Sequence, residues 1–137
     1  MHRILIPVDA DPDRARGQAA FVAALPTAAE NIEVMITHAL TPEEIDAPDE
    51  MQSVDRVETV RLVRDYLQER EFDVELVEGR LPPAEGILGL VREFDVDQVV
   101  MGSRKRSPTG KVIFGSVAQQ VLLESPVPVT VVGAREE

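Results

Sequence analysis

The residues with the clearest chemical potential lie in one stretch of the sequence, MGSRKRSPTGKVIFGS, at positions 101–116. It contains four basic residues and no acidic one, and both lysines of the chain, Lys105 and Lys111, fall inside it. Its three glycines permit tight turns and a close approach of the backbone to a ligand. A helix predicted to begin near Ser116 would add free amide groups and a favourable dipole for an anion. This combination predicts a phosphate-binding loop.

Simpler interpretations of this loop stay open. Ser116 followed by Gln119 fits a capping box, in which the serine would only cap its own helix. The bases could also keep a loop solvated or pair with carboxylates elsewhere in the chain. A nucleotide-triphosphatase P-loop is excluded, because Lys105 stands where its first glycine belongs and Val112 replaces the hydroxyl that binds Mg²⁺.

Three alternating aspartates, Asp9, Asp11 and Asp13, follow the first aliphatic run and raise a different possibility. A Mg²⁺-dependent phosphotransferase would use Asp9 as its nucleophile and the next aspartate as its acid. No acidic pair at a later strand end supports this enzyme, and Asp11 before Pro12 is typical of a helix N-cap. We therefore keep the phosphoaspartyl enzyme only as a distant alternative.

The two histidines, His2 and His38, lie in different predicted strands and have no evident serine or carboxylate partner. We interpret His38 as a hydrogen-bonded residue at the end of a strand. Because no residue clearly positions water, we expect no enzymatic activity beyond a slow hydrolysis of ATP. The sequence predicts no catalytic residue and no metal site.

The hydrophobic pattern indicates five short aliphatic strands that alternate with helices. Strands of this kind form a parallel sheet covered on both faces. Right-handed crossovers favour a doubly wound, Rossmann-like α/β fold with strand order 3-2-1-4-5, in one domain over residues 1–137. The order reverses between the first and fourth strands, which places the loop after Val8 beside the loop after Met101. The predicted strands are 3–8, 32–40, 74–77, 98–101 and 127–132, with helices at 12–25, 51–70 and 116–124 and a further helix that opens at 82.

The composition limits the partners and the setting. Acidic residues outnumber basic ones by 25 to 14, and the net charge of -11 argues against nucleic acid or an anionic membrane as the main partner. No apolar run reaches the ~20 residues that a membrane span needs. The absence of cysteine suits a cytoplasmic protein. Abundant carboxylates with only two lysines are typical of a halophilic protein, because concentrated salt screens the repulsion between surface charges.

With these features the chain resembles the universal stress protein family, which carries the signature Gly-x2-Gly-x9-Gly-Ser/Thr after its fourth strand. Gly102, Lys105 and Gly115-Ser116 occupy those positions with the same spacing. The resemblance implies an adenine nucleotide alpha hydrolase-like fold that binds ATP or AMP, with or without Mg²⁺, at the reversal of strand order. Further matches lie at 4–9 (ILIPVD), 37–39, 82–85 and 126–129, so the resemblance covers nearly the whole chain.

The resemblance also implies which residues form the nucleotide site. The adenine and ribose would face the residues that end the first two strands, and the phosphates would rest against the start of the last helix. The positions carried over are Pro7, Asp9 and the main chain of Ala39 at the base and ribose, Gly102 and Arg104 along the ribose and phosphates, and Lys105, Gly115, Ser116 and Val117 at the phosphates. Met101 is also assigned to the nucleotide site.

Lys105 departs from the family signature, which has glycine at this position. A glycine lets the backbone touch a phosphate, whereas lysine adds a side chain and restricts φ. Either the pocket is narrowed and ATP is excluded, or the ammonium replaces the amide contact with a direct charge on phosphate. The lack of acidic residues nearby favours the second outcome, which is compatible with AMP as well as ATP.

The leading function is therefore a nucleotide-binding stress-response regulator that binds its ligand rather than turning it over. The family resemblance and the exposed edge of a last strand at 127–132 predict a homodimer through that strand. The alternative is a member of the same family that binds no nucleotide and acts through its protein surfaces.

Overall fold

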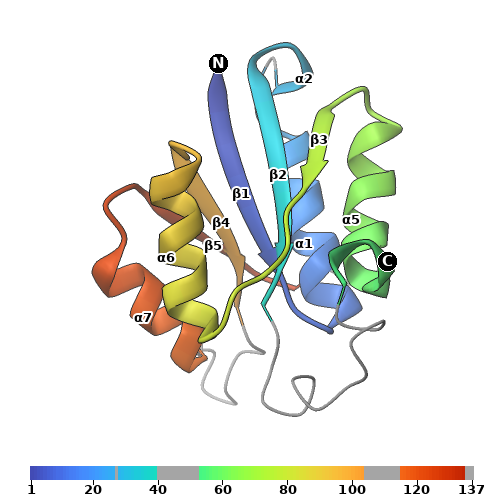
Figure 1. Cartoon of the computed structure of the whole chain (residues 1–137). Coiled ribbons are helices and arrows are strands. Elements are labelled where there is room, and N and C mark those ends of the chain that lie inside the picture. Colours follow the sequence, from blue (N-terminus) through green and yellow to red (C-terminus); the bar gives the residue numbers. More distant parts are fainter. Residues whose placement is uncertain (27, 40–52, 104–114, 135–137) are drawn as a thin grey trace, which may run out of the picture.

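A computed structural model shows a five-stranded, all-parallel sheet in the order β3-β2-β1-β4-β5 (Figure 1). The structure describes residues 1–26, 28–39, 53–103 and 115–134. The predicted fold class and strand order are confirmed. The strands are β1 His2–Val8, β2 Ile32–His38, β3 Asp73–Leu76, β4 Gln98–Gly102 and β5 Val129–Val132.

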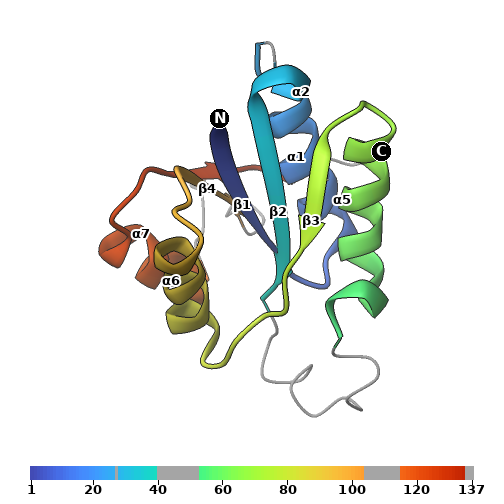
Figure 2. The same cartoon turned by 45° about the horizontal axis from the view of Figure 1, so that its top comes forward.

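Helices cover both faces of this sheet. They are α1 Pro12–Ala23, α2 Ala28–Asn31, α5 Glu58–Gln68, α6 Pro83–Glu93 and α7 Ser116–Glu124, with a 3-10 turn, η1, at Val54–Arg56. The helices α1 and α5 lie on one face and α6 and α7 on the other, as both Figure 1 and Figure 2 show. None of the helices in the described ranges is both long and apolar enough to cross a lipid bilayer.

Each central strand alternates its side chains between two separate hydrophobic cores. In β1, Ile4 and Ile6 are completely buried in the core with α1 and α5, whereas Leu5 is completely buried in the core with α6 and α7. Successive side chains of a strand point to opposite faces, and here both faces are covered. This explains why the central strands appear in the sequence as continuous aliphatic runs.

The first helix meets the end of the last strand at a point without room for a side chain. A β-carbon built on Gly17 of α1 would lie 2.2 Å from the carbonyl oxygen of Gly133, directly after β5. Gly17 is therefore required by the close approach of two backbones. The chain directly after the edge strand therefore lies against α1.

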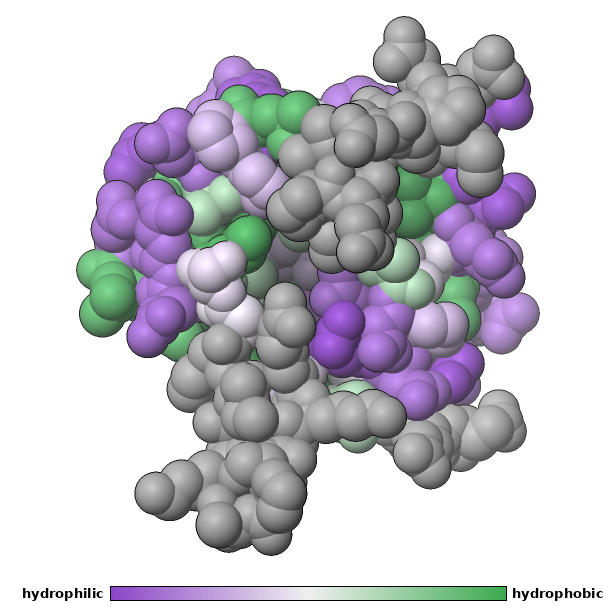
Figure 3. All heavy atoms as spheres, turned by 90° about the horizontal axis from the view of Figure 1, so that it is seen from below, coloured by the Kyte–Doolittle hydropathy of each residue, from purple (hydrophilic) through white to green (hydrophobic). Residues whose placement is uncertain are grey.

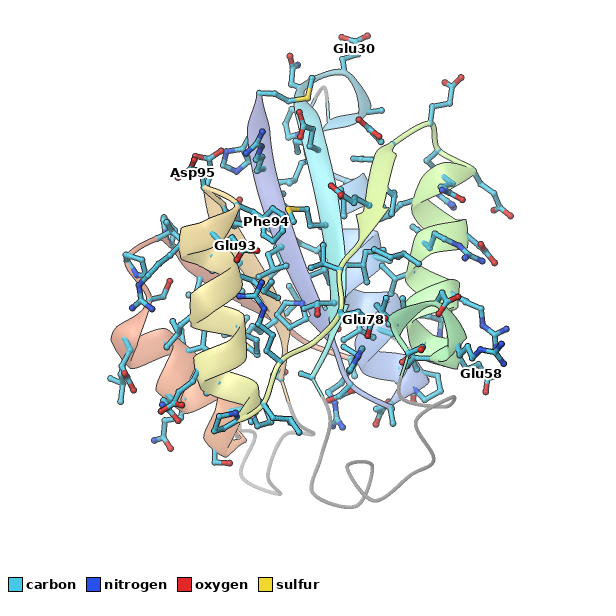
Figure 4. All side chains as sticks on the ribbon, viewed as in Figure 1. Glu30, Glu58, Glu78, Glu93, Phe94 and Asp95 are labelled. Atoms are coloured by element: carbon cyan, nitrogen blue, oxygen red, sulfur yellow. The ribbon has the colours of Figure 1, made fainter. Side chains whose placement is uncertain are left out.

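The helix predicted over 51–70 is wrong in its first part. Val57 is extended, with ψ of 121°, and it separates η1 from α5; residues 51 and 52 lie outside the described residues. The backbone N–H of Val54 donates to the carboxylate of Glu78, at 3.1 and 3.3 Å from its two oxygens. Glu78 follows β3 and lies between that strand and η1 (Figure 4). A contact from a distant segment thus holds Val54 outside the helix.

Several strand ends differ from their predicted positions by one residue, and two differ by two residues. β2 ends at His38, and β5 begins at Val129 rather than at 127. Pro128 has no N–H to donate, although its carbonyl oxygen accepts from the N–H of Val99 at 3.0 Å. The sequence does not predict α2, because four residues are too few to show a helical period.

Candidate functional site

The strand order reverses between β1 and β4, whose carboxyl ends lie at the lower edge of the sheet in Figure 1. The helix α1 follows β1 on one face, and α7 lies on the opposite face. Parallel sheets of this topology bind ligands beyond the strand ends at such a switch point. Figure 3 shows the molecule from this edge, where hydrophilic and hydrophobic residues lie side by side.

One buried amide connects the ends of β1 and β4. The ladder between the two strands ends at the pair of Leu5 and Val99. Beyond it, Nε2 of Gln18 in α1 donates to the carbonyl oxygens of Pro7 at 2.7 Å and Val100 at 3.0 Å. Gln18 is only 1% exposed, so these carbonyls gain a protein partner where the two strands diverge.

Gly102, the last residue of β4, packs against α1. A β-carbon at this position would lie 3.1 Å from Cβ of Arg14 and 3.4 Å from Oε1 of Gln18. The missing side chain lets the end of β4 approach α1 closely. As a result Arg14 lies at the switch point.

Acidic side chains near the start of α1 accept hydrogen bonds from the first N–H groups of this helix. Asp11 is the N-cap, and its carboxylate accepts from the N–H groups of Asp13 at 2.8 Å and Arg14 at 3.2 Å. The carboxylate of Asp9 accepts from the N–H of Asp11 at 3.0 Å and from Nε of Arg14 at 2.8 Å. Asp13 pairs with Arg16. The predicted N-cap is confirmed, and carboxylates already balance the positive end of this helix.

The surroundings of Asp9 fix the position of its backbone. The hydroxyl of Thr59, near the start of α5 and 4% exposed, donates to the carbonyl oxygen of Asp9. Among the residues that the structure describes, no group of three histidine, aspartate or glutamate side chains is arranged to hold a metal ion. The aspartates after β1 therefore have arginine and backbone partners.

The start of α7 has the opposite character. Its N-cap is Gly115, and within the described part of the chain no side chain caps it. Ser116 is the first helical residue and is exposed, so the capping box considered for it is not formed. The first N–H groups of any helix lack a partner within the helix, and this first turn contains no acidic residue. It can offer amide donors and a positive dipole end to an anion.

Apolar residues of the predicted site collect on the face of the sheet from which α7 begins. Pro7 belongs to the same face as Leu5, which is buried in the core with α6 and α7. Ala39, Met101 and Val117 belong to that core or pack against it. Pro7 and Met101 are buried, whereas Ala39 and Val117 are partly exposed, so apolar side chains lie on the α7 side of the strand ends.

All the predicted site residues that the structure describes lie at the carboxyl edge of the sheet or at the start of α7. Asp9 and Gly102 lie on the α1 side, and Gly115 and Ser116 begin α7. The predicted phosphate contacts at residues 104 and 105, an arginine and a lysine, lie outside the described residues. Their direction relative to the site stays a prediction.

Sequence reasoning missed the polar residues that hold this edge together. Gln18 did carry a signal, because it interrupts the apolar residues around it in α1, such as Ala19 and Val22. Thr59 carries none, because Asp9 becomes its neighbour only through the tertiary fold. Arg14 is five residues after Asp9, and its pairing with Asp9 was not predicted.

His38 has a structural environment at the end of β2. It is 7% exposed, its Nε2 accepts from the N–H of Gly79 at 3.3 Å, and it lies 3.6 Å from the carboxylate of Glu78. A β-carbon on Gly79 would come within 2.4 Å of the carbonyl oxygen of His38. The prediction of a hydrogen-bonded residue at a strand end is confirmed.

Known proteins resemble this chain over nearly its full length. A model of the universal stress protein family matches residues 1–133. The stress response protein NhaX of Bacillus subtilis is 28% identical over 122 residues, which cover 89% of this chain and 69% of that protein. A universal stress protein structure from Archaeoglobus fulgidus aligns with a TM-score of 0.75 and 29% identity, over 96% of this chain and 98% of the other. A second structure from that organism, in complex with dAMP, aligns with a TM-score of 0.67 and 22% identity over the same shares.

Proposed function

The chain belongs to the universal stress protein family, and we propose that it binds an adenine nucleotide, AMP or ATP, at the switch point between β1 and β4. In this proposal the protein is a cytoplasmic stress-response regulator that acts by binding. Hydrolysis of ATP, with or without Mg²⁺, would be slow at most.

The observation that carries this proposal is the start of α7. It is a helix N-terminus with a glycine cap and without an acidic residue, at the carboxyl edge of the sheet. The sequence contains no acidic residue from 98 to 123, although the whole chain has a net charge of -11. A phosphate group satisfies both the free amides and the helix dipole.

The base and the phosphate of a mononucleotide would contact different groups at this edge, apolar side chains and backbone amides. The base would pack against the apolar face that Pro7, Ala39 and Met101 provide, and the phosphate would accept from the amides of residues 115–117. The carboxylate of Asp9 already accepts two hydrogen bonds, from a backbone N–H and a guanidinium. It retains lone pairs for a ribose hydroxyl, because a carboxylate can accept about four bonds.

The family supports adenine as the base. One Archaeoglobus fulgidus relative has been solved with dAMP, which contains the same base as AMP and ATP. Arg104 and Lys105 would add positive charge at the phosphates, as their positions in the family signature imply. A lysine at 105 would contact phosphate through its ammonium group.

Calorimetry with AMP and ATP, in buffers from low to molar KCl, tests the proposal. We expect binding by the wild type and weaker binding by Lys105→Ala. The control is Arg61→Ala on the exposed surface of α5, which also removes one positive charge and should bind as the wild type does. Nucleotide released when the purified protein is denatured would give independent support. The proposal fails when the wild type gives no binding heat at millimolar nucleotide.

We also propose a homodimer that forms through β5. This strand is at the edge of the sheet, and all four of its residues are partly exposed. Unpaired edge groups can form a ladder with a second copy, and the proline at 128 limits that ladder to the strand itself. Light scattering should give twice the chain mass at micromolar concentration, and a monomer in molar salt would contradict the dimer.

The acidic surface suggests a working environment of high salt. The net charge of -11 opposes compact folding at low ionic strength, and the Debye length falls to about 3 Å at 1 M salt. The melting temperature should therefore rise as KCl is added. A melting temperature independent of KCl would rule out this adaptation.

A further inference from the structure

Thr37 has a buried hydroxyl group without a hydrogen-bond partner. It is 0% exposed, and its Oγ1 makes no hydrogen bond within the part of the chain that the structure describes. Most buried side-chain polar atoms in folded proteins do have a partner, so an exception suggests that a partner arrives from outside. The buried Thr59 is a useful contrast, because its hydroxyl is bonded to a backbone carbonyl.

The strand register places this hydroxyl among residues of the proposed site. Thr37 on β2 is paired with Pro7 on β1. Ala39 follows Thr37 by two residues in the chain. Alternation puts Thr37 on the same face as Met35, which is buried in the core with α6 and α7. A ligand that contacts both Pro7 and Ala39 on this face passes next to Thr37.

The immediate neighbours explain why the hydroxyl has no partner in the described part of the chain. On the β3 side Val77 packs against the same core, and its N–H is used by the carbonyl of Ile36. Pro7 and Ala39 are apolar as well. Among the described residues these neighbours offer the hydroxyl no hydrogen bond, and a bound ligand could supply one.

The position in the sheet indicates which part of a nucleotide that group belongs to. Thr37 is on β2, two strands from β4, which corresponds to about 10 Å at the usual strand spacing. A phosphate held by the amides at the start of α7 would therefore leave the base, at the far end of the nucleotide, near β2. Base edges carry ring nitrogens that accept hydrogen bonds and, in adenine, an amino group that donates them.

We propose that Thr37 is a specificity-determining residue whose hydroxyl bonds the edge of the adenine base. This inference rests on the proposed nucleotide site and adds the residue that recognises the base. The hydroxyl can donate to a ring nitrogen or accept from the amino group, because it has one hydrogen and two lone pairs.

Titration of AMP and ribose 5-phosphate into Thr37→Val and Thr37→Ser separates base recognition from the rest of the site. We expect Thr37→Val to bind AMP about 3- to 10-fold more weakly, while its affinity for ribose 5-phosphate stays that of the wild type. Thr37→Ser retains the hydroxyl and should keep most of the AMP affinity. Equal AMP binding by wild type and Thr37→Val would overturn the inference, as would equal losses for both ligands.

Thermal unfolding without ligand provides a second readout that does not depend on nucleotide. Valine has the shape of threonine and removes the unpaired hydroxyl, so Thr37→Val should raise the melting temperature by about 2–4 °C. The matched variant Thr59→Val removes a bonded hydroxyl and should lower it. A lower melting temperature for Thr37→Val would show a partner within the protein and overturn the inference. Absence of AMP binding by the wild type would instead overturn the nucleotide site itself.

Discussion

The starts of α1 and α7 are the two helix N-termini that flank the reversal of strand order, and they differ in almost every respect. The start of α1 has a carboxylate cap at Asp11 and a further acid in its first turn, and Arg14 pairs with Asp9 beside it. The start of α7 has Gly115 as its cap and no acid in its first turn. Both helices bring the same backbone dipole to the same edge of the sheet.

The difference predicts that an anion would bind at the start of α7 rather than at the start of α1, because only the first N–H groups of α1 are occupied by side chains of the described residues. At α1 the carboxylate of Asp11 accepts the amide hydrogens of residues 13 and 14 that an anion would otherwise take. At α7 the corresponding groups are left without a side-chain cap among the described residues. The phosphate should therefore lie at α7, and α1 should serve as a support.

The largest effect should follow when the start of α7 is made to resemble that of α1. Gly115 has φ of -72° and ψ of 165°, which any residue can adopt, so Gly115→Asp places a capping carboxylate there without backbone strain. Its charge would occupy the amides and repel phosphate, and we expect AMP affinity to fall by at least about 100-fold. The melting temperature without ligand should rise, because the helix gains a cap.

Gly115→Asn is the matched control for this change. Asparagine caps a helix as well as aspartate does but carries no charge, so it should weaken AMP binding less. Calorimetry and thermal unfolding on the same samples check both quantities. If Gly115→Asp binds AMP as the wild type does, the phosphate is not at α7.

A smaller effect is expected when the side-chain amide of Gln18, which joins the ends of β1 and β4, is removed. Gln18→Leu would leave the carbonyl oxygens of Pro7 and Val100 without their side-chain donor. The free energy of unfolding should fall by about 2 kcal/mol, and AMP should bind more weakly because the ends of β1 and β4 are no longer fixed. Denaturant titration measures the loss, with Gln68→Leu on the exposed surface of α5 as the neutral substitution. Equal losses in the two variants would show that the bridge contributes nothing.

The smallest effect on binding should come from the start of α1. Asp11→Ala removes its cap and should lower the free energy of unfolding by about 1 kcal/mol, whereas Asp11→Asn retains the cap and should cost less. AMP affinity should change less than about threefold, because the phosphate is expected at the other helix. A tenfold change in affinity for Asp11→Asn would mean that the two helix starts share the ligand.

Much of the fold could be predicted because it depends on local patterns. The aliphatic runs of β1 and β2 and the apolar period of α7 are visible in the sequence, and α7 begins and ends at the predicted residues 116 and 124. The break at Val57 could not be predicted. It depends on Glu78, which is distant in the sequence and bonds the backbone of Val54 only in the folded chain.

The candidate site divides in the same way. Gly115 could be placed because it precedes a predicted helix start near the switch point, whereas Pro7 was assigned to the site through the family resemblance. The bond of Thr59 to Asp9 could not be predicted, and neither could the hydroxyl of Thr37 that has no partner among the described residues, because both depend on segments that are distant in the sequence. A sequence shows where a ligand can approach, and the tertiary structure shows which groups are still free to receive it.

The contact between Gly17 and Gly133 links the two surfaces proposed for this protein. The backbone after β5 lies so close to α1 that even a methyl group at Gly17 would overlap it. A partner chain that displaced the end of β5 toward the helix would therefore have to displace α1 as well. The helix α1 carries Arg14, which pairs with Asp9, and Gln18, which joins β1 to β4. Dimer formation at β5 and nucleotide binding at the strand ends would then be mechanically coupled.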